Sequence, residues 1–92
     1  MIPYITLSID GKTQQHRLHW SDTAYMQGSR LHGGWMAGPP LPDDVCEYLN
    51  CMIWEGNERS GRLPSGYGDY SRATWQVYGY LDAPGEKGGY DA

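Results

Sequence analysis

Residues 2–9 alternate between apolar and polar positions, which predicts a β-strand with one buried face. The face expected to be buried carries Ile5, Leu7 and Ile9. Asp10-Gly11 follows, a pair that a two-residue type I′ turn prefers, so residues 12–20 are expected to return as a second strand. Such a turn pairs Ile9 with Lys12, Leu7 with Gln14, Ile5 with His16 and Pro3 with Leu18. The polar run TQQHR indicates an edge strand, or a strand whose second face meets something other than core.

A helix is predicted from Pro42 to about residue 55. Proline is tolerated in a first helical turn, and acids such as Asp43 and Asp44 favour the positive end of the helix dipole. One helical face then carries Val45, Leu49, Met52 and Ile53. Gly56-Asn57 is a typical stop signal. Several residues of this segment also suit sheets, so a strand remains the alternative.

Residues 72–81 alternate again and predict a second clear strand. A short helix is expected over residues 21–31 after a Ser21-Asp22 cap, and the glycines and prolines of residues 33–42 predict a loop. A further strand within residues 54–64 is left open. The expected fold is α+β, with a small antiparallel sheet (N-terminal hairpin plus C-terminal strand) and one or two short helices. Residues 1–82 form one compact domain in this interpretation, and residues 83–92 form a flexible tail.

The composition predicts a folded domain whose core is rich in Trp and Tyr. Among the 92 residues there are four Trp, eight Tyr and no Phe, and the net charge is only −4. Disordered chains, in contrast, combine few aromatics with high net charge. Trp and Tyr carry a polar tip and lie best where one end stays wet. Not all twelve can be buried in so small a domain, and clustered surface aromatics are typical of interfaces.

The N-terminal stretch MIPYITLSID has no basic segment and no long apolar run, so neither a signal peptide nor a membrane span is expected. A cytoplasmic protein, monomeric when free, is the expectation. Cys46 and Cys51 on one helix would project about 140° apart, which excludes a disulfide between them and predicts two free thiols.

Catalytic and metal chemistry find little support in the sequence. His16 and His19 would point to opposite faces of one strand, and a Cys–His pair such as Cys46 with His32 has no supporting signature. GGW and SGYG lack the order of residues that cradles phosphates. No catalytic residue, metal or cofactor is expected, and the chain is not expected to be an enzyme.

The stretch SGYGDYSR at residues 65–72 has the residue chemistry of an antibody loop. Its candidate contact residues are Tyr67, Asp69, Tyr70 and Arg72. The alternative is that both tyrosines cover a thin core. Two roles are likewise open for Trp35. Its ring either packs a loop onto the core or contacts a partner.

Charge is unevenly distributed. Residues 1–38 hold two acids against three bases, whereas residues 39–92 hold nine acids against four. The first half offers a candidate RNA-contact set of Lys12, His16, Arg17, His19 and Arg30, although a solvated edge strand would look the same and free nucleic-acid binders are usually basic. The second half offers a candidate protein-contact set of Asp43, Asp44 and Glu47.

Small size, an acidic balance, many aromatics and the hairpin sequence ITLSIDGKTQQHRLHW at residues 5–20 resemble phage-encoded anti-CRISPR proteins, in particular inhibitors of type I surveillance complexes. The resemblance extends over the whole chain but carries no residue-level motif. It implies a non-enzymatic protein of the host bacterial cytoplasm that binds a multi-subunit CRISPR ribonucleoprotein stoichiometrically. Such binding blocks hybridisation of target DNA or recruitment of the nuclease, with acids meeting a lysine-lined channel and bases reaching guide RNA.

Two other functions are compatible with the sequence. One is a small single-stranded nucleic-acid-binding domain that uses the hairpin. The other is a phage structural or assembly accessory protein that self-associates through an open sheet edge.

Overall fold

The first hairpin forms with the register that its turn predicts. In the computed structural model, which describes residues 2–81, β1 (Tyr4–Ile9) and β2 (Lys12–Arg17) pair antiparallel. Ile9 lies opposite Lys12 and Ile5 opposite His16, so the predicted pairing is confirmed. Asp10 and Gly11 have φ angles of 50° and 80°, the two positive values that a type I′ turn requires.

The hairpin belongs to a four-stranded antiparallel sheet of order β2-β1-β6-β5. Strand β6 (Thr74–Tyr78) pairs with β1, and the short β5 (Ser60–Arg62) pairs with β6. The C-terminal strand and the edge position of β2 are therefore confirmed, and β5 is the further strand left open between residues 54 and 64. A single 3-10 turn, η1 (Gly68–Tyr70), precedes β6.

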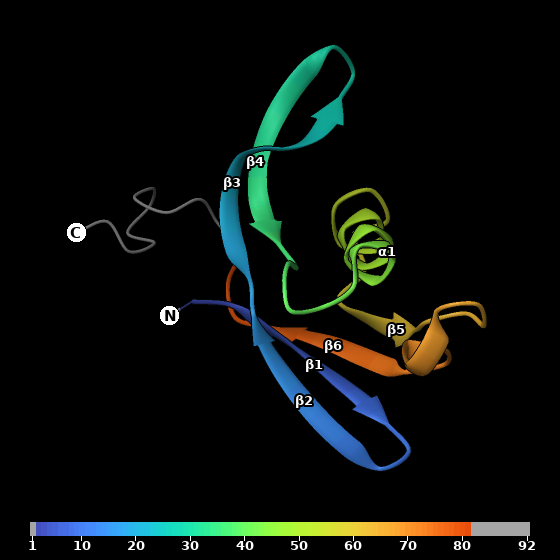
Figure 1. The fold of residues 1–92 in the computed structure, drawn as a ribbon. Helices are drawn as coiled ribbons and strands as arrows, with labels where there is room; N and C mark the ends of the chain where they lie inside the picture. Colours follow the sequence, from blue (N-terminus) through green and yellow to red (C-terminus); the bar gives the residue numbers. More distant parts are fainter. Residues whose placement is uncertain (1, 82–92) are drawn as a thin grey trace.

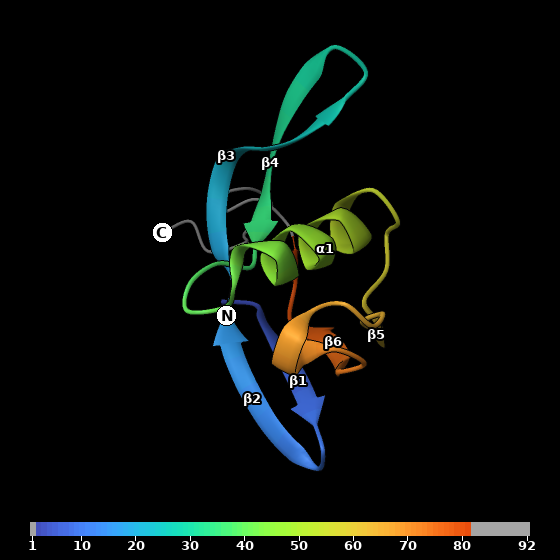
Figure 2. The same ribbon diagram turned by 45° about the vertical axis from the view of Figure 1, so that its right-hand side comes forward.

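Helix α1 (Asp43–Trp54) covers one face of this sheet, as Figure 2 shows. It begins after Pro42 and ends at Glu55, which confirms the predicted start and stop. The helix buries Val45, Cys46, Leu49 and Ile53. The sheet contributes Ile5, Leu7, Trp75 and Val77 to the same core. The alternation of β1 and β6 and the helical spacing of α1 together produce this core.

The prediction for residues 21–36 is wrong, because a second hairpin replaces the predicted helix and the first part of the predicted loop. Residues 37–42 lie outside every helix and strand, as predicted. Strands β3 (His19–Gln27) and β4 (Arg30–Met36) pair antiparallel as a separate two-stranded sheet. Gly28, which weakened the predicted helix, is the first residue of the turn and has a φ of 65°. Figure 1 shows this β3–β4 arm reaching well beyond the four-stranded sheet.

The glycines that suggested a loop are instead positions where aromatic rings lie against a strand. A Cβ atom on Gly34 would approach the Trp54 indole to 2.7 Å, and one on Gly33 would collide with Trp20. The Trp54 Nε1–H donates a hydrogen bond to the Trp35 carbonyl at 2.7 Å. The pairing shifts register between Ser21 and Tyr25, an irregularity of the kind that bends a strand.

The fold class is thus α+β with small antiparallel sheets, as predicted. The predicted tail at residues 83–92 lies outside the described part of the chain. Within residues 2–81, no helix has both the length and the apolar character needed to cross a membrane.

Replacing Gly28 with alanine distinguishes the observed hairpin from the predicted helix, because the free energy of unfolding should change in opposite directions in the two structures. In a helix the change would raise the free energy of unfolding by about 1 kcal/mol. At a φ of 65° it should lower that free energy by about 1–2 kcal/mol, because the left-handed region costs an L-residue that much. Urea unfolding of Gly28→Ala beside Ser29→Ala, which changes an exposed neighbour, checks this. A more stable Gly28→Ala protein would contradict the hairpin.

Candidate binding surfaces

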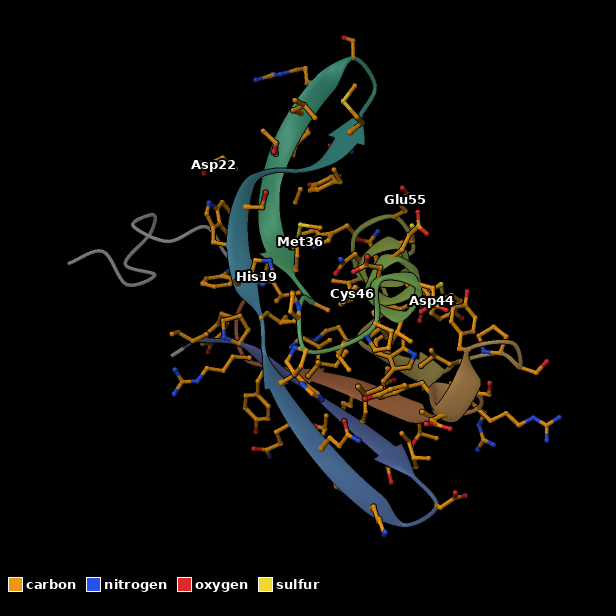
Figure 3. All side chains as sticks on the ribbon, viewed as in Figure 1. His19, Asp22, Met36, Asp44, Cys46 and Glu55 are labelled. Atoms are coloured by element: carbon orange, nitrogen blue, oxygen red, sulfur yellow. The ribbon has the colours of Figure 1, made fainter. Side chains whose placement is uncertain are left out.

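A groove of about 760 Å³ runs between α1 and the base of the β3–β4 arm. In Figure 3, His19 and Met36 lie on the arm and Cys46 lies on the facing side of α1. The rim on the helix side is acidic, since Asp43, Asp44 and Glu47 also line the groove. These three carboxylates are exposed and come from the first turns of one helix. The structure therefore brings the predicted acidic set together.

The charge of α1 is unopposed. Its sequence contains three acids and no lysine or arginine, and Glu55 follows directly. Within residues 2–81 these carboxylates form no ion pair with a base. The Asp44 side chain accepts a hydrogen bond from the Val45 N–H at 2.8 Å, inside the first turn. The helix side of the groove rim is thus a concentrated negative surface.

The two thiols are free and are poorly suited to nucleophilic chemistry. Burial raises the pKa of Cys46, and the nearby Asp43 and Asp44 carboxylates raise it further. The pKa of exposed Cys51 is raised by partial burial first and then by Glu55 and Glu47. A reactive cysteine needs the opposite surroundings, in which positive charge favours the thiolate.

The SGYGDYSR segment divides into packed and exposed residues. Tyr67 and Tyr70 are half-buried and pack against the core, and the Tyr67 ring lies 5.5 Å from that of Tyr48. The Tyr70 hydroxyl donates to Gln14 Oε1 at 3.4 Å, which ties the segment to β2. The tyrosines thus cover the core, whereas Asp69 and Arg72 are exposed and available for contact. Arg72 has a φ of 66°, a costly conformation for a residue with a side chain.

The predicted basic set does not come together. Lys12 and His16 lie on the face of β2 that faces α1, because they pair with Ile9 and Ile5. Arg17 lies on the opposite face. His19 is at the groove, and Arg30 is beside the turn of the arm. Alternation within β2 and the unpredicted second hairpin separate these five side chains.

Trp35 lies in the core with 5% of its surface exposed, so the structure matches the interpretation as a packed ring. It meets Trp20 edge-on at 5.6 Å between ring centroids. The loop expected around it is strand β4.

Two surfaces were missed by sequence reasoning. At the end of the arm, Met26 and Leu31 lie opposite one another and are 56% and 57% exposed. On the four-stranded sheet, the face turned away from α1 carries Tyr4 and Tyr78, whose rings stack at 5.1 Å. The alternation in residues 2–9 and 72–81 could have revealed this second surface had the pairing of β1 with β6 been known.

Comparison with protein-family models, curated proteins and solved structures finds no match to this chain. In the part of the chain that the structure describes, no group of three or more His, Cys, Asp or Glu side chains could hold a metal ion.

His16 should make stability depend on pH. Burial lowers the pKa of His16, whose Nε2 lies 2.9 Å from Gln14 Oε1. The unfolded chain then takes up a proton near its ordinary pKa of about 6.5, before the folded protein does. The contribution of His16 is complete above that value and is lost as pH falls through the folded pKa. Chemical unfolding between about pH 7 and 5 should show a smaller loss for His16→Gln than for the parent. Equal losses would contradict this.

Cys51 should be the thiol that reacts in the native state, and it should react slowly. Its raised pKa leaves less thiolate at about pH 8 than a free cysteine has. Glu55→Gln should accelerate its alkylation by iodoacetamide, because one repelling charge is removed. Glu58→Gln is the matched control, and mass spectrometry gives both rates. Equal rates in the two variants, or prior reaction at buried Cys46, would contradict the arrangement.

Proposed function

We propose that this chain is a non-enzymatic binding protein that inhibits a CRISPR surveillance complex stoichiometrically. It blocks hybridisation of target DNA or recruitment of the nuclease. The observation that carries the proposal is the unopposed negative surface of α1, with Asp43, Asp44 and Glu47 along one side of an open groove. The choice of a CRISPR complex as partner rests on the resemblance in size, composition and N-terminal hairpin.

A surveillance complex holds nucleic acid in a basic channel, and a surface rich in carboxylates is complementary to such a channel. Asp43 and Glu47 are four residues apart and therefore project to one side of the helix. Opposed charges of this kind speed association and make it sensitive to salt. The packed core beneath the acids holds them in place, since Val45 and Leu49 on the same helix are fully buried.

The chemistry of the groove supports binding more than catalysis. The thiol at its floor has a raised pKa, which keeps it protonated near neutral pH. Asp69 and Arg72 add two exposed side chains of opposite charge outside the groove. In this proposal the chain acts as a monomer in the cytoplasm of the bacterial host.

A gel-shift titration tests the proposal. The chain is added in increasing amounts to a type I surveillance complex, followed by labelled target DNA, and a nuclease-recruitment assay is run on the same samples. Stoichiometric inhibition requires at least one chain per complex at the end point. An end point far below one chain per complex would show enzymatic inactivation instead. Normal DNA binding together with normal nuclease recruitment would contradict the proposal for that complex.

The acidic surface is tested with two variants that remove equal charge. Asp43→Asn/Glu47→Gln should raise the concentration for half-inhibition about 3- to 30-fold, since two exposed ion pairs contribute roughly that much. Asp10→Asn/Glu58→Gln removes two carboxylates away from the groove rim and should leave inhibition nearly unchanged. Circular dichroism confirms that both variants are folded. Equal weakening in both would show that net charge matters and that the α1 surface does not.

A further inference from the structure

The face of the four-stranded sheet that points away from α1 has no covering element among residues 2–81 (Figure 1). Antiparallel pairing places directly opposite residues on the same face, so the registers define three rows across it. The first row is Arg17, Tyr4 and Tyr78. The second is Gln15, Thr6, Gln76 and Ser60. The third is Thr13, Ser8, Thr74 and Arg62.

We propose that this open face binds single-stranded nucleic acid. The charge of this face favours a polyanion, because the three rows contain Arg17 and Arg62 but no carboxylate, although the chain carries a net charge of −4. Both arginines are exposed. They lie in the two edge strands, at opposite corners of the face. A polyanion lying across the sheet meets one cation on each side and no acid between them.

Two tyrosine rings lie together on the same face. Tyr4 and Tyr78 stack with centroids 5.1 Å apart and an angle of 18° between their planes, and Tyr78 remains 39% exposed. Every base has a π-face, so exposed rings on a sheet bind unpaired bases with little sequence preference. A duplex keeps its bases stacked inside and cannot use this platform. The occupant is therefore single-stranded.

Polar side chains lie between the two arginines on this face. The side chains of Gln15 and Gln76 are exposed and form no hydrogen bond within the described residues. Two hollows of about 410 and 270 Å³ lie on this face, one beside Arg17 and Tyr4 and the other over Thr6 and Gln76. Amides and hydroxyls of this kind pair with base edges and sugar hydroxyls.

This assignment does not rest on the CRISPR proposal, since it uses the opposite side of the molecule and a free oligonucleotide tests it. Fluorescence polarisation measures binding of the full chain to labelled single-stranded RNA, single-stranded DNA and duplex DNA of equal length at about 20 mM salt. Single strands should bind and the duplex should not. If RNA binds more tightly than DNA, the hydroxyl and amide side chains of this face contact the 2′-hydroxyl of the ribose. If the two bind equally, the face recognises bases and phosphates.

Two pairs of variants locate the site. Tyr78→Leu should weaken binding about 5- to 150-fold, the range measured for loss of one stacked base, whereas Tyr67→Leu on the α1 side should not. Arg17→Gln should weaken binding and lower the salt slope by about 0.7, whereas Lys12→Gln on the other face of the same strand should not. Absence of binding to both single strands at low salt overturns the assignment. Equal losses in Arg17→Gln and Lys12→Gln overturn it as well, and so does binding of duplex as tightly as single strands.

Discussion

Helix α1 packs on two different surfaces at once, and the positions of both sheets depend on it. Toward the four-stranded sheet, Val45, Leu49 and Ile53 fill the core. Toward the β3–β4 arm, the contacts are polar and aromatic. The Ala37 N–H donates to Asn50 Oδ1 at 2.8 Å, and the Trp54 ring stacks on Tyr25 at 5.1 Å. A short domain has little core to spare, so these specific contacts at the far side of the helix hold the arm in place.

The parts of the fold that local pattern predicts correctly are those whose residues interact with near neighbours. The Asp10-Gly11 turn sets the register of the first hairpin, and the spacing of Val45, Leu49 and Ile53 sets the buried face of α1. The second hairpin was missed because its glycines are required by contacts with residues far away in the sequence. Gly34 is small so that the ring of Trp54, twenty residues later, can lie against the strand. Nothing within a short window reveals such a contact.

The candidate sites follow the same division. The acidic residues lie together because helical spacing alone brings Asp43 and Glu47 to one side. The basic set was separated because neighbouring residues of β2 alternate between its faces, which puts His16 and Arg17 on opposite sides. The open face could be predicted only from the pairing of β1 with β6, whose residues lie about seventy positions apart in the sequence.

The resulting molecule has a negative helix on one side and an acid-free, tyrosine-bearing sheet face on the other. In the two proposals, the helix binds basic protein and the sheet face binds single-stranded nucleic acid. The central claim is that these surfaces act separately. It is tested most directly by a map of backbone amide chemical shifts in the ¹⁵N-labelled chain as single-stranded RNA is added. The account predicts shifts in β1, β6 and the facing residues of β2 and β5, with α1 unchanged. Shifts centred on α1, or no shifts at all, would contradict it.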